Sequence, residues 1–290
     1  MMQPSDIGMI VIDLDGTVLG NGPIDQRDID AVNAAMDRGI EVVVATGRSW
    51  KESRDALRQL RHRGVMIGAG GAMLHETESG ATLDRSVLNA NSIQAMTASL
   101  VEHGFLVNLL QDSMATGFDY WMVGPHEPHP ATSWWFEHHD ITARWVDRLE
   151  EVEAFDHTVR VGAVGHGRPL AELSGRLKRQ MGSDAVVQYW EAVVESPAED
   201  GTDSIHLFEG FDAGVDKWTM IEGLLESRGL EPRNVVAIGD GLNDIGMLSN
   251  AGLGIAMANA KAEIQAVADR VTGPIGGGVA DAINGLLSSR

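Results

Sequence analysis

The chain has 290 residues, which is enough for one large domain or two modest ones, each with its own core. Its 42 acidic and 22 basic residues give a formal charge of -20, which argues against a nucleic-acid partner, because nucleic-acid binding needs a basic face. The chain has no cysteine, so disulfides, thiolate catalysis and cysteine-bound metals are excluded.

Two further absences bear on location. No run approaches the roughly 18 apolar residues that a membrane-spanning helix needs, so no membrane partner is expected. Residues 1–6 lack a basic region followed by an apolar one, which predicts that no signal peptide is present. We therefore expect a cytoplasmic protein.

The first predicted element is a buried strand over residues 7–12, and it ends in Asp13-Leu14-Asp15-Gly16-Thr17. If the strand geometry persisted, the carboxylates of Asp13 and Asp15 would point to the same face. Two like charges at the end of an apolar strand are costly, so such a pair is typical of metal binding or of shared nucleophile and acid–base work. The alternative is a solvated turn, where Asp-Gly is common.

A regular alternation of helices and strands follows. Asp25 is expected to cap a helix that ends before Gly39, the strand 39–45 ends in Thr46-Gly47-Arg48, and the helix 50–62 leads to a strand at 64–69. This rhythm predicts right-handed crossovers and a parallel sheet.

Residues 83–209 break the rhythm and form an insertion. A structureless loop of more than 120 residues is excluded, because the segment carries its own periodic patterns. We expect helices near 92–103, 147–155 and 170–181, apolar strands at 105–110, 158–164 and 185–190, and a loop rich in Pro, His and Trp at 124–139.

The alternation resumes with Lys217, which opens the amphipathic segment 216–228. The strand 235–238 then ends in Gly239-Asp240-Gly241-Leu242-Asn243-Asp244. The remaining predicted elements are the helices 244–250, 259–268 and 279–287 and the strands 253–257 and 269–272.

Polar side chains therefore stand where several of the predicted strands end. In an open parallel sheet, ligands bind beyond the carboxyl ends of the strands, so the segments that hold Asp13, Thr46 and Asp240 are expected to converge, and Lys217 joins them from a helix start. Carboxylates are suitable ligands for a divalent metal. A hydroxyl, a lysine and backbone amides that neighbouring glycines leave accessible are suitable partners for a phosphate.

Taken together, these four stretches resemble the signature motifs of the haloacid dehalogenase (HAD) superfamily. Residues 239–248 and 254–260, with the ending 268–280, resemble its Cof-type (IIB) sugar-phosphatase branch. The resemblance covers roughly 7–82 and 205–285. It implies an α/β fold with a Rossmann-like doubly wound parallel sheet core (1–82 and 210–290) and an inserted α+β cap domain (83–209) over the catalytic mouth.

The resemblance also implies roles for single residues. Asp13 is the expected nucleophile, which forms an aspartyl phosphate, and Asp15 the general acid and base. The metal is Mg²⁺, held by Asp13, Asp240 and the backbone carbonyl of Asp15, while Asp244 holds a metal-bound water or orients a neighbouring residue. The residues expected to hold the substrate phosphate are Thr46, Gly47, Lys217 and Asn243. Plain helix capping is the alternative for Asp244 and for Asn243.

The function implied is an Mg²⁺-dependent phosphatase that hydrolyses a small phosphorylated metabolite, such as a sugar phosphate. The alternatives are a phosphotransferase or phosphomutase of the same fold and a non-catalytic regulatory module that binds such a metabolite. Two departures from the family pattern stand out. Gly70 occupies a position that is often asparagine, and Trp218 follows the lysine where glycine is common, either as core packing or to narrow the site.

A histidine-rich group in the insertion has three interpretations: a zinc-type site, a loop that contacts substrate through stacking tryptophans, or ordinary packing. Its spacing matches no helical metal motif. The group consists of His126, Glu127, His129, Trp134, Trp135, Glu137, His138 and His139.

Overall fold

A computed structural model describes residues 6–191 and 205–288. The described residues do not include 1–5, 192–204 and 289–290. Parts of both predicted domain ranges, and most of the N-terminal segment that was predicted to hold no signal peptide, therefore lie outside the described residues. The chain divides into two compact units, Met1–Asp84 with Asp216–Arg290, and Arg85–Val215. Within the described ranges, no helix has the length and apolar character needed to cross a membrane.

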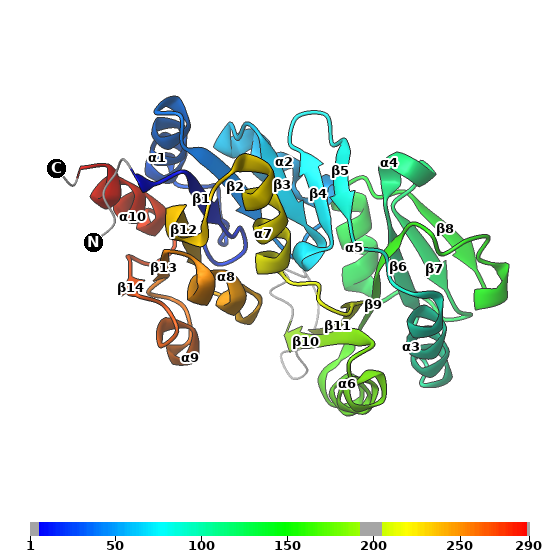
Figure 1. Cartoon of the computed structure of the whole chain (residues 1–290). Coiled ribbons are helices and arrows are strands. Elements are labelled where there is room, and N and C mark those ends of the chain that lie inside the picture. Colours follow the sequence, from blue (N-terminus) through cyan, green and yellow to red (C-terminus); the bar gives the residue numbers. More distant parts are fainter. Residues whose placement is uncertain (1–5, 192–204, 289–290) are drawn as a thin grey trace. The chain divides into compact units, whose positions relative to one another are not determined.

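The first unit holds an eight-stranded sheet with helices on both faces (Figure 1). Its elements are β1 (Met9–Ile12), α1 (Gln26–Asp37), β2 (Glu41–Ala45), α2 (Trp50–Leu60), β3 (Val65–Gly68), η2 (Ala69–Gly71), β4 (Met73–Glu76), β5 (Thr82–Arg85), α7 (Lys217–Arg228), η4 (Pro232–Asn234), β12 (Val235–Gly239), η5 (Leu242–Asp244), α8 (Ile245–Asn250), β13 (Leu253–Ala256), α9 (Ala262–Gln265), β14 (Arg270–Val271) and α10 (Gly278–Leu287).

The strand order explains where a ligand site must form. The order is β14-β13-β12-β1-β2-β3-β4-β5, and the strands from β14 to β3 are parallel. The chain runs outward from β1 in one direction through β2 and β3, and in the other through β12 and β13. The crevice of a doubly wound sheet opens at such a switch point, here at the carboxyl ends of β1 and β12.

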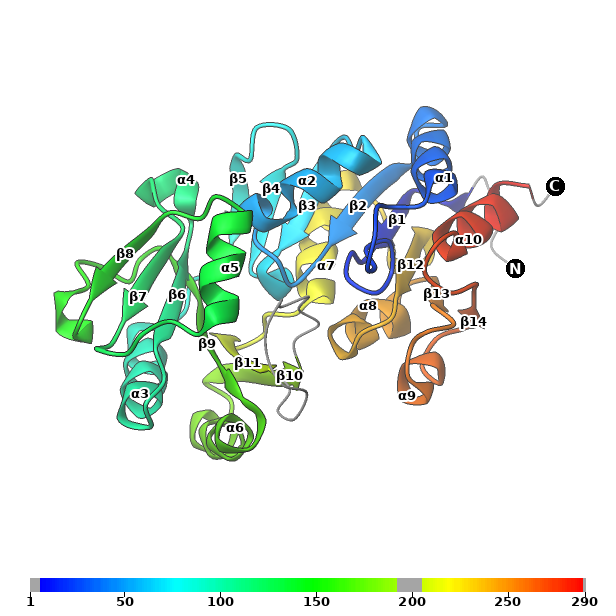
Figure 2. The same ribbon diagram turned by 180° about the vertical axis from the view of Figure 1, so that it is seen from behind.

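The apolar strands supply both layers of the core, because alternate side chains point to opposite faces. Ile10 and Ile12 pack with α1, α2 and α10, the layer that faces the viewer in Figure 2. Met9 and Val11 pack with α7, α8 and α9 on the other face, where α7 and α8 stand in front of the sheet in Figure 1. The predicted doubly wound α/β fold is confirmed.

The second unit holds a six-stranded sheet of order β10-β11-β9-β6-β7-β8, antiparallel except between β7 and β8. Helices α3 and α6 pack against β9 and its neighbours. The elements are α3 (Ala90–Glu102), β6 (Val107–Gln111), α4 (Ser113–Thr116), β7 (Tyr120–Val123), α5 (Pro130–His138), β8 (Ala143–Val146), η3 (Leu149–Glu151), β9 (Thr158–His166), α6 (Gly167–Met181), β10 (Ala185–Glu191) and β11 (Ile205–Asp212).

Several local predictions for the insertion were wrong. The segment 124–139 contains the helix α5, because Pro130 suits the first turn and the ring of His129 accepts from the Ala131 amide. The helix predicted at 147–155 is only the short turn η3, since Val152 is the one apolar side chain there that is buried. The boundary predicted at 209 falls inside β11, which pairs with β10 as far as Asp212.

In the first unit, the helix predicted at 259–268 is reduced to the four residues of α9. The following strand, predicted at 269–272, is reduced to the two residues of β14. Ile264 is the only buried side chain of α9, so little packing is available to extend that helix.

Candidate active site

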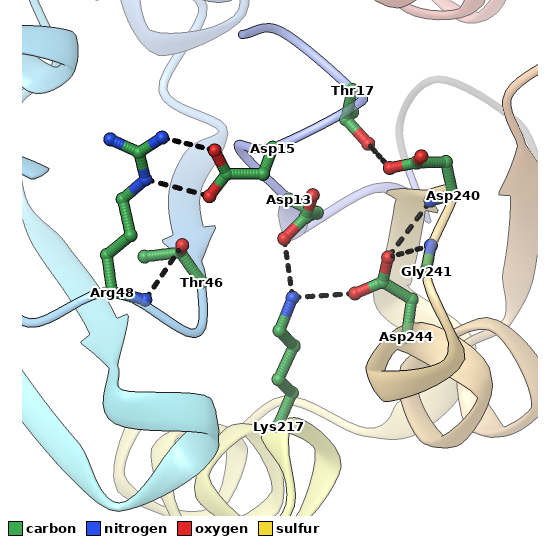
Figure 3. Close-up of polar contacts among 9 residues, drawn as sticks. All are labelled: Asp13, Asp15, Thr17, Thr46, Arg48, Lys217, Asp240, Gly241 and Asp244. Carbon is green, nitrogen blue, oxygen red and sulfur yellow. Dashed lines mark hydrogen bonds and ion pairs between the residues drawn. The ribbon is translucent and has the colours of Figure 1, made fainter. Parts of the chain in front are cut away.

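A buried lysine lies at the centre of the site (Figure 3). Lys217 Nζ donates to Asp13 Oδ1 at 2.6 Å and to Asp244 Oδ1 at 2.6 Å. Asp13 follows β1, Asp244 lies in the loop after β12, and Lys217 is the first residue of α7, so three elements meet at one ammonium group. Burial alone lowers the pKa of Lys217, but the two carboxylates outweigh this effect and raise its pKa above the usual value.

The start of α7 shows how this cation is held at a helix N-terminus, where the helix dipole disfavours it. Asp216 caps the helix by accepting from the Thr219 amide at 2.7 Å. Gly71 lies against this turn, since a Cβ at Gly71 would come within 2.1 Å of the Asp216 carbonyl oxygen. Gly70 is left-handed, with φ 66°, a conformation that glycine adopts freely and asparagine tolerates, so its departure from the family pattern preserves the backbone.

Asp244 is fully buried and fixes the loop after β12. Its Oδ2 accepts from the backbone amides of Asp240 at 2.9 Å and of Gly241 at 2.8 Å, while Oδ1 accepts from Lys217. The alternative of capping α8 is not observed, because the Asp244 side chain makes no capping bond to that helix.

Asp240 is oriented by a residue that the sequence analysis did not single out. Thr17 is buried, and its hydroxyl donates to Asp240 Oδ1 at 2.9 Å. Burial raises the pKa of Asp240 to about 6, and the bond from Thr17 opposes that rise. Thr17 stands in the first motif, but no sequence pattern shows which distant carboxylate its hydroxyl meets.

The donor set of this cluster fits a divalent cation. Each of Asp13, Asp240 and Asp244 offers a carboxylate oxygen, and these atoms lie within 4.8 Å of one another. Three carboxylates and one ammonium leave two negative charges in a largely buried space. The pKa of Asp13 is raised well above its ordinary value, mainly by burial and secondly by the nearby Asp244 carboxylate. A bound cation favours the ionised form of all three, and oxygen-only ligands suit Mg²⁺.

Asp15 lies differently from its neighbours. Its carboxylate is half-exposed and accepts from Arg48, from Nε at 2.8 Å and from Nη2 through the other oxygen (Figure 3). Its side chain is therefore not part of the carboxylate cluster. The sequence analysis predicted no role for Arg48, although its place two residues after Thr46 puts it just beyond β2, the strand next to β1.

Of the four residues expected to hold phosphate, all but Lys217 lie at the ends of β2 and β12. Thr46 is buried, and its hydroxyl accepts from the Arg48 amide at 3.2 Å. A Cβ at Gly47 would lie 3.9 Å from Asn243 Nδ2, so these two residues face each other. Figure 3 shows Thr46, Asp13 and Asp240 at the ends of neighbouring strands, with Lys217 below them.

The open question about Trp218 is answered by packing. Its side chain is buried in the core layer that also contains Ile221 and Leu225. It therefore stabilises the docking of α7 on the sheet.

The histidine-rich group forms no metal site. Among residues 6–191 and 205–288, the three aspartates above are the only cluster of three or more ligating side chains that is close enough to hold an ion. His138 and His139 instead lie against Trp134 and Trp135, one turn earlier in α5, with ring centroids 5.0 and 4.2 Å apart. The zinc-type interpretation is thus not supported.

Comparison with known proteins agrees with this geometry. Residues 10–283 match the family model of the haloacid dehalogenase-like hydrolases, so the chain belongs to that family. The chain is 26% identical over 280 residues to the 5-amino-6-(5-phospho-D-ribitylamino)uracil phosphatase YcsE of Bacillus subtilis, with 96% of this chain and 95% of that protein covered. It is 24% identical over 262 residues to the HMP-PP phosphatase of Cronobacter sakazakii, with 88% and 85% covered.

Solved structures show the same fold. A haloacid dehalogenase-like hydrolase from B. subtilis aligns with a TM-score of 0.78 and 22% identity, covering 97% of this chain and 100% of the other. The subclass IIB sugar phosphatase BT4131 aligns with a TM-score of 0.75 and 20% identity, covering 96% and 98%. The predicted family and the predicted enzyme class, a HAD-like phosphatase, are confirmed.

Proposed function

We propose that the protein is an Mg²⁺-dependent phosphatase that hydrolyses a small phosphorylated metabolite through an aspartyl phosphate on Asp13. The observation that carries the proposal is the buried cluster in which Lys217 contacts Asp13 while Asp240 and Asp244 offer further oxygens within 4.8 Å. The relatives support the substrate class, since their names include phosphatases of a phosphoribityl compound and of phosphoglycolate.

The proposed reaction has two steps. A carboxylate oxygen of Asp13 attacks phosphorus as the bond to the ester oxygen breaks, and Asp15 gives its proton to the leaving oxygen. Asp15 then takes a proton from water, which attacks phosphorus and breaks the bond to Asp13. The products are the alcohol and inorganic phosphate, and both aspartates return to their starting forms.

The other residues hold the charges of this reaction. Mg²⁺, when bound, supplies positive charge to the phosphoryl oxygens, and Asp13, Asp240, the carbonyl of Asp15 and, through water, Asp244 would hold it. Lys217 contributes a further cation. The Thr46 hydroxyl, the Gly47 amide and the Asn243 amide are the proposed donors to the phosphoryl oxygens.

We assign substrate selection to the second unit, proposed as an α+β cap domain. The support is that every proposed catalytic residue and metal ligand belongs to the first unit, which leaves specificity to other residues. The histidine- and tryptophan-bearing helix α5 belongs to this second unit. A cytoplasmic location remains part of the proposal.

A panel of phosphorylated metabolites tests the function. After chelation and dialysis, the protein is expected to release no phosphate, and added Mg²⁺ or Mn²⁺ is expected to restore release from at least one substrate. Inorganic phosphate and the dephosphorylated product should appear in equal amounts. A phosphomutase would instead give an isomer without free phosphate. If no compound turned over and one still bound in calorimetry, the protein would be a binding module.

A further inference from the structure

We infer that Asn259 is a positioning residue for Asp240 and through it for the divalent cation. This inference rests on the metal site of the proposed function. The Asn259 amide nitrogen Nδ2 lies 2.8 Å from the Gly16 carbonyl oxygen and 3.4 Å from Asp240 Oδ2. One side chain in the turn after β13 therefore contacts both the loop after β1 and the carboxylate after β12.

The orientation of this amide is fixed by its neighbours. Its oxygen Oδ1 accepts from the Ile275 backbone amide at 2.9 Å, and a backbone N–H can only donate. The Gly16 carbonyl can only accept, so it must face the NH₂ group. A flipped amide would lose both bonds, and the donor is therefore held toward Asp240 even though the residue is exposed.

Thr17 and Gly16 complete the surroundings of the Asp240 carboxylate. Thr17 donates to Oδ1, so each carboxylate oxygen faces a separate donor. Gly16 is left-handed, with φ 82°, and a Cβ there would lie 2.1 Å from Asp240 Oδ2. Only glycine lets the loop come this close, which is what places the Gly16 carbonyl within reach of Asn259.

These contacts join the loops of four adjacent strands. Thr17 follows β1, Asp240 follows β12, Asn259 follows β13 and Ile275 follows β14. A ligand carboxylate with both oxygens hydrogen-bonded has a fixed direction, and loss of such supporting bonds commonly weakens metal affinity about 10- to 100-fold. Thr17, which holds one oxygen of Asp240, belongs to the first motif, whereas Asn259, which holds the other oxygen, lies outside the four motifs.

Mn²⁺ binding to the metal-free protein tests the inference without relying on turnover. Free Mn²⁺ is titrated by electron paramagnetic resonance, with circular dichroism to check folding. For Asn259→Ala, the dissociation constant is expected to rise about 10- to 100-fold. Asp240→Asn is included as the variant that removes a ligand, and its binding should be lost.

Gln265→Ala is the matched control. The Gln265 amide supports the same turn through the carbonyls of Ala258 and Ala260, both at 3.1 Å. Among the described residues, its side-chain amide donates to neither Asp240 nor Gly16. Its Mn²⁺ affinity should stay within about twofold of the wild type, by contrast with the 10-fold or greater loss at a supporting residue.

Three results would overturn the inference. Wild-type affinity in Asn259→Ala, with binding lost in Asp240→Asn, would leave the metal site standing and remove Asn259 from it. Equal losses in Asn259→Ala and Gln265→Ala would reduce Asn259 to support of the turn. Unchanged binding in Asp240→Asn would reject the proposed metal site itself, and the positioning role with it.

Discussion

At the scale of single residues, the site combines a buried carboxylate with a buried cation. Asp13 has little exposed surface, and its pKa is raised mainly by burial, so this proposed nucleophile depends on positive charge nearby to remain ionised. Lys217 supplies one charge at 2.6 Å, and the proposed cation supplies more. The proposed nucleophile and the proposed metal are therefore coupled through their charges.

Replacing Asp13 with asparagine should abolish turnover. The change keeps the shape of the side chain but removes the attacking carboxylate, and a loss of about 10⁴-fold or more in kcat is expected for a covalent nucleophile. Steady-state phosphate release measures the effect. Circular dichroism controls for folding, and near-normal turnover by a folded variant would reject the covalent mechanism.

Arg48→Lys should impair catalysis without weakening the binding of the cation. A lysine cannot make the two-point contact of the guanidinium with Asp15, so the proposed acid–base group loses its fixed orientation. We expect kcat/KM to fall about tenfold, equivalent to about 1.4 kcal/mol.

The control for Arg48→Lys is Arg58→Lys. Arg58 is an exposed residue of α2 that forms an ion pair with Asp55 of the same helix. Its kinetics should match those of the wild type. Equal behaviour of the two variants would show that the Asp15–Arg48 pair has no part in the reaction.

At the scale of elements, Asp28 links two helices of the first unit. It is a fully buried residue of α1, and it accepts from the amides of Gly277 at 2.9 Å and Ala280 at 2.7 Å at the start of α10. α10 has no side-chain cap of its own at Gly277, so a carboxylate from another helix serves that purpose.

Asp28→Asn should destabilise the protein by about 1–3 kcal/mol, because the asparagine NH₂ group cannot accept one of the two amide bonds and leaves that donor unsatisfied. Urea unfolding gives the free energy. Asp30→Asn, at an exposed position on the same helix, should change stability by less than about 0.5 kcal/mol. Similar values for the two variants would contradict the role of Asp28.

His62 makes stability depend on pH. It is buried just beyond α2, between Thr77 Oγ1 at 3.0 Å and the Val42 carbonyl of β2 at 2.8 Å, and burial lowers its pKa below the ordinary 6.5. Between the lowered and the ordinary pKa, the unfolded chain binds a proton that the folded chain does not. The contribution of His62 to stability is therefore complete above about pH 7 and decreases as the pH falls from 6.5 towards the lowered pKa.

Unfolding free energies measured between pH 7.5 and 5.5 check this prediction. The wild type should lose stability as the pH falls, and His62→Gln should show a shallower slope, because glutamine does not titrate. Parallel slopes for the two proteins would mean that other groups cause the pH dependence.

The elements also show what a sequence reveals. β1, β2 and β12 were predicted closely, because buried parallel strands are continuous apolar runs that end in turn formers. β4, β5, β7, β8 and β11 were not predicted. β5 and β8 carry exposed and half-exposed side chains, and their strand state depends on neighbours distant in the sequence.

The same limit applies within the site. Asp13, Lys217, Asp240 and Asp244 were predicted to converge, because they stand at the ends of strands or at a helix start, and the structure brings them together. Thr17 and Asn259 meet Asp240 through loop geometry, which no periodicity encodes.

At the scale of the whole molecule, the two units differ in how the chain makes them. The second unit is one continuous segment, Arg85–Val215, with its own sheet and helices. The first unit is made from two separated segments. A continuous segment with its own core is expected to fold alone.

Expression of residues 85–215 as a fragment tests this. The fragment should show a cooperative thermal transition by circular dichroism and should bind no Mn²⁺, because every proposed ligand lies in the other unit. A fragment without a transition would show that the second unit needs the first to fold.

The placement of β1 beside β12 has a consequence for synthesis on the ribosome. Thr17 and Asp240 are 223 positions apart, and the whole second unit is translated between them. Until β12 emerges, β1 has an unpaired edge and apolar faces, which is the condition in which nascent strands associate wrongly. The second unit is complete before that point. The cluster of Asp13, Asp240 and Asp244 is thus acquired late by the growing chain, and any product that ends before Asp240 lacks it.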